Sequence, residues 1–357
     1  MTTLRETSEP TSTRTVNGKL LRDLIRARVQ LSKIEARVFR RDFLPVLRRM
    51  EAETVARLEQ VKADKLSDVT RAQVEATLAE IRAIIQNAGE KLVDAGESAA
   101  KDVASREARM QHATYTRALP SAVELGTVGV EQLAAIVRST TSDLFRPYAR
   151  TWGAKALDKA KASIEDSVLI GEDMKQAARR LRDAIGASQH DAMMMARTGI
   201  QSAAAQVTRA YHDENQDVMK GVQWVATLDA RTCVICGGLD GKTWTYGEPG
   251  PDDEGPISEL PTIPVHPGCR CTTAGAVKSW RELGLNIDDV DVPGGRASMN
   301  GEVPDSLSFE DWLKDQPEKV QRSVLGVARF DLFRRGELDL EDFTVDLRRR
   351  TLDELRR

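Results

Sequence analysis

The sequence predicts a mainly α protein with elongated helical N-terminal and middle regions, a small α+β module and a helical C-terminal tail. Three observations lead to this fold class. Apolar residues recur at helical spacing along most of the 357 residues. Only 4% of the residues are aromatic, and a core of Leu, Val, Ile and Ala favours helices with narrow apolar seams. All four cysteines lie in a segment where the helical periodicity stops.

The composition argues against both a disordered chain and a membrane protein. Hydrophobic residues make up 41% of the chain and charged residues 30%. No apolar run approaches the ~18 residues that a membrane helix needs. The net charge of −3 argues against binding of nucleic acid through the bulk charge of the whole chain. We therefore expect a soluble protein that is made in a cytoplasm and has no membrane partner.

The N-terminal part is predicted to be a flexible tail followed by a helical region. Residues 1–18 are rich in Ser, Thr and Glu, and residues 19–119 show helical periodicity. The first helix begins near Leu20, and Pro45 is expected to break or kink it. A second long helix is expected to end near Gly96.

The first fifty residues are locally basic, with twelve Lys or Arg against five acidic residues. Two interpretations stay open. The charges can form a solvated helix face, or they can form a contact surface for DNA or an acidic partner.

Residues 120–221 are predicted to form a helical middle region. Gly171 is expected to end a helix because glycine tolerates the left-handed conformation of a C-cap. Ser188 and Asp191 resemble a capping box that opens a helix running to about His212. The other helices of this region are expected near residues 130–138, 151–168 and 172–186.

At Val222 the pattern changes, and residues 222–292 are predicted to form the α+β module. Two β-type runs occur among glycines and prolines, at 222–226 and 242–246. A Gly/Pro/Asn-rich linker is expected at residues 293–306. A helical tail follows at residues 307–357, and we expect it to dock through Trp312 and Phe330.

The strongest chemical signal is a cluster of cysteines and one histidine. Cys233-x-x-Cys236 is separated by 29 residues from His266-x-x-Cys269-x-Cys271. Two thiolates two residues apart can face one ion from a tight turn, and Gly237 and Gly238 would supply the backbone freedom of that turn. A second pair of donors closes a tetrahedron, and this donor set suits Zn²⁺.

Five candidate ligands are available for four positions. We favour Cys233, Cys236, His266 and Cys269, with Cys271 as the replacement for either of the last two. The alternatives are two disulfides or buried free thiols.

The donor pattern favours a structural metal over a catalytic one. A catalytic zinc keeps an open position and needs a general base. Glu259, Glu254 and Asp240 are close in sequence, but no HExxH or HxE arrangement is present. Asp229 is expected to accept hydrogen bonds from amides of the turn. The sequence therefore predicts no enzyme and no catalytic residue.

Two segments carry a resemblance to a known family. Trp224–Gly241 contains the pattern W-x(4)-D-x-x-T-C-x-x-C-x-x-x-D-G, and after a Pro-rich loop His266–Cys271 reads H-P-x-C-R-C. This pattern resembles the signature of the phage Mu F-like, or SPP1 gp7-like, head morphogenesis proteins, the minor head proteins of tailed phages. The resemblance extends over about residues 150–345, with a helical lead-in upstream and Phe309–Leu313 downstream.

The resemblance implies a minor capsid component of the virion, placed inside the head near the portal and made in the host cytoplasm. It implies a role in head morphogenesis, DNA packaging or ejection. The expected partners are the portal protein and the major capsid or scaffold proteins, with packaged DNA facing the basic residues 1–50. The alternative is a zinc-containing DNA-binding protein or a metal-dependent nuclease that acts outside the particle.

Overall fold

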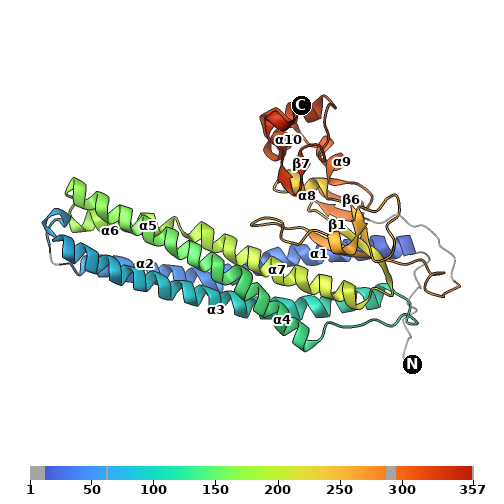
Figure 1. Cartoon of the computed structure of the whole chain (residues 1–357), viewed down its shortest axis with the longest axis horizontal. Coiled ribbons are helices and arrows are strands. Elements are labelled where there is room, and N and C mark those ends of the chain that lie inside the picture. Colours follow the sequence, from blue (N-terminus) through green and yellow to red (C-terminus); the bar gives the residue numbers. More distant parts are fainter. Residues whose placement is uncertain (1–12, 62, 287–294, 356–357) are drawn as a thin grey trace. The chain divides into compact units, whose positions relative to one another are not determined.

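The computed structural model describes residues 13–61, 63–286 and 295–355, and in these ranges the chain is mainly helical, as the sequence predicts (Figure 1). Residues 13–18 of the predicted flexible tail belong to the first helix, and the rest of that tail lies outside the described residues. None of the described helices is long and apolar enough to cross a membrane.

The chain divides into two compact units. The helical unit comprises residues 32–104 and 131–203. The sheet unit comprises the described parts of residues 1–31, 105–130 and 204–357.

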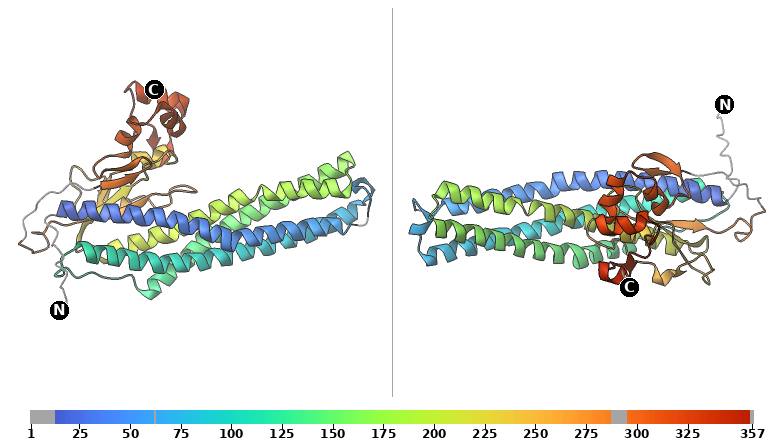
Figure 2. Two further views of the ribbon diagram at one scale, coloured as in Figure 1. Left: turned by 180° about the vertical axis from the view of Figure 1, so that it is seen from behind. Right: turned by 90° about the horizontal axis from the view of Figure 1, so that it is seen from above.

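The helical unit consists of long helices that lie side by side (Figure 2). α6 packs against both α2 and α5. The elements of the helical unit are η1 (a π-helical segment, Phe39–Phe43), α2 (Leu44–Glu59), the 3-10 helix η2 (Leu66–Asp68), α4 (Val130–Thr140), η3 (π-helical, Thr141–Phe145), α5 (Arg146–Ile170) and α6 (Met174–Gly186). Three longer helices contribute to both units: α1 (Thr13–Val38), α3 (Arg71–Ala118) and α7 (Gln189–Glu214).

The helices predicted for the middle region correspond to α4, α5, α6 and α7. Gly171 ends α5 in the left-handed conformation, with a φ of 67°, as predicted. The predicted capping box of Ser188 and Asp191 is wrong. The Ser188 side chain is buried and donates its hydroxyl hydrogen bond back to the carbonyl of Ile185, at 2.6 Å.

The chain stays helical through Pro45, where the sequence predicts a break or kink. Proline has no N–H, and its ring conflicts with the carbonyl four residues earlier. In η1, just before Pro45, the N–H of Leu44 bonds instead to the carbonyl of Phe39, five residues back. This wider turn accommodates the proline without ending the helix. Pro147 follows η3 in the same way.

A close contact around Phe145 explains why α3 does not end near Gly96, as the sequence predicts, but continues to Ala118. Phe145 is fully buried, and its ring packs against Gly96 of α3 and Gly199 of α7. A Cβ added at Gly96 would lie 2.6 Å from the ring, and one at Gly199 would lie 2.2 Å from it. Both glycines are therefore required for packing and lie inside their helices.

Gly199→Ala should lower the free energy of unfolding by about 1–3 kcal/mol, because overpacking costs more than the gain in helix propensity. Gly153→Ala is the matched control, since its nearest neighbour would be 3.8 Å away. We expect that variant to be as stable as the parent chain or more stable. Urea unfolding followed by circular dichroism measures both, and equal stability of the two variants would contradict the packing argument.

The sheet unit contains a four-stranded sheet with the order β3-β2-β1-β4. β1 is antiparallel to β2 and β4, whereas β2 and β3 are parallel. β1 and β2 confirm the two predicted β-type runs. The strands and the short helices between them are β1 (Met219–Val225), α8 (Val234–Gly238), β2 (Thr243–Thr245), β3 (Gly255–Pro256), η4 (Ile257–Glu259) and β4 (Thr272–Val277).

A buried polar contact attaches β4 to α3 and α7. The Tyr115 hydroxyl accepts a hydrogen bond from the N–H of Gly275 at 2.9 Å and lies 3.3 Å from Nε2 of His212. Burial lowers the pKa of His212 to about 3, so the imidazole is neutral at physiological pH. The sheet is thereby tied to both helices by groups without charge.

The segment predicted as a linker contains a hairpin of β5 (Gly295–Ser298) and β6 (Gly301–Pro304). Trp312 and Phe330, the expected docking residues of the tail, are buried in one cluster with Leu228 and Val234. The remaining elements are α9 (Phe309–Lys314), α10 (Glu318–Leu325), α11 (Val327–Arg334), a second hairpin of β7 (Thr344–Val345) and β8 (Arg348–Arg349), and α12 (Leu352–Leu355).

Candidate metal centre

The sheet brings the two halves of the cysteine–histidine cluster together. β1 and β4 are antiparallel neighbours, and Val225 at the end of β1 pairs with Thr272 at the start of β4. The chain that leaves β1 and the chain that enters β4 therefore start from the same end of the sheet. The first carries Cys233 and Cys236, and the second carries the other three donors.

Cys233 and Cys236 form the turn that the sequence predicts. Cys233 precedes α8, and its sulfur accepts a hydrogen bond from the N–H of Cys236 at 3.4 Å. The expected role of the two following glycines differs. Gly237 has no unusual backbone conformation, but a Cβ there would lie 2.4 Å from the ring of Phe309. Gly237 therefore provides space for the C-terminal core.

His266 directs one ring nitrogen at the cysteines of the turn. Its Nε2 lies 3.3 Å from the sulfur of Cys233 and 3.3 Å from that of Cys236. The Nδ1 atom donates a hydrogen bond to the carbonyl of Pro267 at 3.0 Å. This second hydrogen bond fixes the ring so that Nε2 is the ligand atom.

The other two cysteines form a second group with Cys236. The sulfurs of Cys236 and Cys269 are 3.8 Å apart. The donor atoms form two groups, each with all members within 4.8 Å of one another: Cys233, Cys236 and His266, and Cys236, Cys269 and Cys271. Cys236 belongs to both groups. All five predicted ligands are thus brought together, and no disulfide joins any of the four cysteines, which all lie in the described part of the chain.

The separations of neighbouring donors around Cys236 fit a tetrahedral metal ion. Zinc bonds of about 2.3 Å to sulfur and about 2.0 Å to nitrogen require donor separations of about 3.5–3.8 Å. The separations of 3.3 Å and 3.8 Å lie close to this range. Three of the donors are buried and the other two are partly buried. Cys269 does not lie within 4.8 Å of both Cys233 and His266, so a metal bound by Cys233, Cys236, His266 and Cys269 requires the two groups of donors to move closer together.

Hydrogen bonds within the cluster separate the pKa values of its donors. The hydrogen bond with Cys236 lowers the pKa of Cys233 to about 4, with His266 adding to the effect. The hydrogen bond with Cys233 raises the pKa of His266 to about 9. A metal that binds both groups displaces the proton of the imidazolium, so metal binding is coupled to proton release.

A second link joins the two segments beside the donors. Arg270, between the last two cysteines, donates from both Nη atoms to the carboxylate of Asp229. Asp229 also accepts from the N–H of Arg231 at 2.9 Å, as expected for a carboxylate that orders the turn. Burial opposes ionisation of Asp229, but the Arg270 hydrogen bonds outweigh it and keep the pKa below its usual value.

Residues 158–274 match the family described as Phage Mu protein F like protein. The match confirms the Mu F-like resemblance. The family suggests a phage head morphogenesis protein. The matched segment contains the four-stranded sheet and all five donors. No curated protein and no solved structure matches the chain.

The Mu F-like segment is tied to the C-terminal part of the sheet unit by a buried ion pair. Asp240 accepts from Arg296 at 2.9 Å and 3.0 Å. The same carboxylate accepts from the N–H groups of Ala226 and Phe309, at 2.7 Å and 2.8 Å. Arg296 in turn donates to the carbonyls of Ala226 and Leu307. Both charges are buried, and one carboxylate orders β1, β5 and the start of α9.

Sequence reasoning missed Arg296. It lies in the segment interpreted as a linker, outside the Mu F-like match, and nothing in the local pattern marks it. The available signal was Asp240 itself, because a buried aspartate requires a partner.

Three carboxylates of the module are engaged with basic groups. Asp229 binds Arg270, Asp240 binds Arg296, and Glu254 pairs with Lys242 at 3.0 Å. A carboxylate held by an arginine or a lysine is a poor general base, because the positive charge stabilises its ionised form. Their common role is to connect segments of the chain.

Asp240→Asn should destabilise the sheet unit by about 3–5 kcal/mol, since it leaves the Arg296 charge buried without its partner. Asp252→Asn is the matched control, because Asp252 is exposed. Hydrogen exchange at the β1 and α9 amides measures the effect, and we expect faster exchange only in Asp240→Asn. Unchanged protection in that variant would contradict the role of the ion pair.

Proposed function

We propose that this protein is a minor head protein of a tailed phage, located inside the head near the portal. In this role it acts in head assembly, DNA packaging or ejection, with the portal protein and the major capsid or scaffold proteins as partners. The observation that carries the proposal is the Mu F-like match over residues 158–274, which contains the complete donor cluster.

We further propose that the cluster binds a structural Zn²⁺ through Cys233, Cys236, His266 and Cys269, with Cys271 as the alternate ligand. The donor set supports this choice, because thiolates with one imidazole are typical ligands of structural zinc. The zinc supplies folding free energy to the module when it is bound. The arginine partners of the neighbouring carboxylates support a structural role over a catalytic one.

The basic N-terminal region is the surface we propose for DNA or the portal. Part of its charge is used within the chain, since Arg28 bonds to Thr272 and Arg49 pairs with Glu53. Lys33, Arg37 and Arg40 are exposed and recur at helical spacing, so they form a basic stripe on one face. This stripe is available to a negatively charged partner.

The ligand set predicts different results for two serine variants. Cys269→Ser should lose most of the bound zinc, because it removes a proposed ligand, whereas Cys271→Ser should retain about one equivalent. The two variants are matched, since both thiols are buried and both changes replace sulfur with oxygen. Elemental analysis of the purified full chain measures the zinc content. Retention in Cys269→Ser with loss in Cys271→Ser would reverse the assignment of these two residues.

Quantitative mass spectrometry of gradient-purified proheads and finished particles tests the location. The particles are taken from cells that produce this protein together with its native neighbours. We expect a few copies per particle that survive washing. Absence from both kinds of particle would contradict the proposal and would favour a DNA-binding protein or a nuclease that acts outside the particle.

A further inference from the structure

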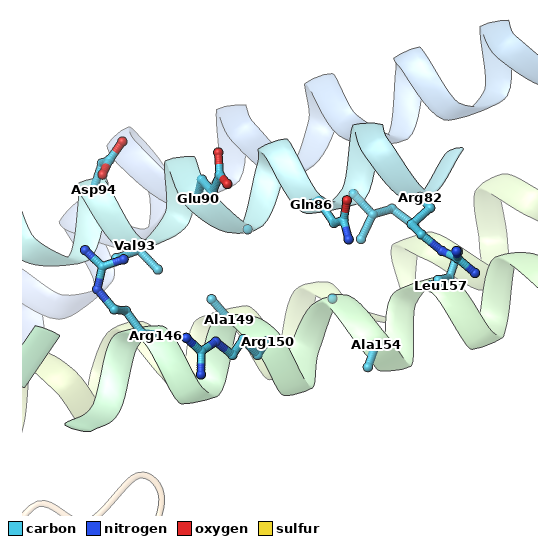
Figure 3. A pocket seen from close by; sticks show the side chains of 13 residues that line it. Arg82, Gln86, Glu90, Val93, Asp94, Arg146, Ala149, Arg150, Ala154 and Leu157 are labelled. Atoms are coloured by element: carbon cyan, nitrogen blue, oxygen red, sulfur yellow. The ribbon is translucent and has the colours of Figure 1, made fainter. Parts of the chain in front are cut away.

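A groove runs along the helical unit between α3 and α5. One part has a volume of about 860 Å³ (Figure 3) and the next about 910 Å³, and the two parts share Arg82 and Leu157. Along α3 the groove extends from residue 71 to residue 94, which is roughly 35 Å of helix. Its length is therefore that of a helix–helix interface.

Small residues form the floor of the groove. A Cβ added at Gly89 would lie 3.8 Å from the carbonyl oxygen of Ala149, and one added at Gly153 would lie 3.8 Å from Ile85. α3 and α5 therefore run antiparallel and close together beneath the groove. A small-residue floor lets the backbone of another helix approach closely.

The two walls carry opposite charges at three levels, whereas Glu75 and Glu165, which share a fourth level, each pair with a basic residue of their own helix. Because the helices are antiparallel, Asp94 lies opposite Arg146, and Glu90 lies opposite Arg150 (Figure 3). Further along the groove, Arg82 on α3 and Asp158 on α5 lie at the same position along the groove. Among the ion pairs of the described residues, none joins the two walls, although other pairs form within each helix. The wall charges are therefore available to a second molecule.

The far end of the groove presents an exposed apolar side chain. Leu169, at the end of α5, is 81% exposed, and its neighbour Ile170 is 62% exposed. The opposite wall at this end carries Val69 and Val74. Adjacent large apolar side chains at the end of a groove indicate a contact surface.

We propose that the groove packs against the same groove of a second copy of this chain, about a two-fold axis parallel to α3 and α5. Such a rotation keeps the position of every residue along the axis. It places the α3 wall of one copy against the α5 wall of the other. Glu90 of each copy then faces Arg150 of the other, and Asp94 faces Arg146. Leu169 of each copy covers Val74 of the other. Every contact occurs twice, as in an isologous interface.

Charge complementarity selects a second copy as the occupant. An unrelated helix would need acidic groups opposite the α5 arginines and basic groups opposite the α3 carboxylates, in this register. The second copy presents these acidic and basic groups in the required order, because its α3 and α5 walls carry the same complementary charges. The opposite charges also fix the register of the two copies.

Sedimentation velocity of the full chain from about 1 to about 100 µM tests the proposal, over the range expected for a polar interface. We expect a concentration-dependent equilibrium between monomer and dimer. Arg150→Glu and Glu90→Arg should each raise the dimer Kd at least about tenfold through like-charge contacts. The double variant Glu90→Arg/Arg150→Glu should restore dimerisation, because both pairs form again with reversed sign. Arg48→Glu, an exposed change outside the groove, is the control.

Leu169→Ser is a second, independent variant and should also weaken the dimer. Circular dichroism monitors helix content in every variant, and all altered side chains are exposed. A monomer over the whole concentration range overturns the proposal. A dimer that Arg150→Glu and Leu169→Ser leave unchanged overturns it as well.

Discussion

The contact between residues 229–240 and residues 264–271 is the constraint on which the sheet unit depends most. The first segment leaves β1 and the second enters β4, the two strands with the longest pairing of the sheet. Between them the chain travels through α8, β2, β3 and η4. Side chains of Cys236, His266 and Cys269 meet where that excursion begins and ends. The cluster therefore closes a loop that contains half of the sheet.

The local core explains why side-chain links are needed there. The cluster of buried residues around the donors is small, and three of its members are themselves cysteines. A core of this size supplies limited hydrophobic stabilisation. Two arginine–carboxylate pairs supply such links. The Asp229–Arg270 pair joins the two donor segments of the module, and the Asp240–Arg296 pair joins the module to the C-terminal part. A metal adds folding free energy where apolar burial is limited.

The sequence predicts the helices and the donors well because both depend on local patterns. The end of α5 follows from Gly171, and the meeting of five donors follows from their spacing. The errors arise where tertiary packing overrides local preference. Gly96 looks like a helix end, but it lies inside α3 because the ring of Phe145 leaves no room for a Cβ. Arg296 was missed, since nothing in its own segment marks it and its partner Asp240 is distant in sequence.

X-ray absorption at the zinc edge of the purified full chain tests the central claim, that one metal joins the two segments. The account predicts a four-coordinate zinc with three sulfur ligands at about 2.3 Å and one nitrogen ligand at about 2.0 Å. The nitrogen signal should disappear in His266→Ala, because His266 supplies the only nitrogen of the proposed ligand set. A ligand shell of oxygen atoms, or a purified protein with quantitative disulfides and no metal, would contradict it.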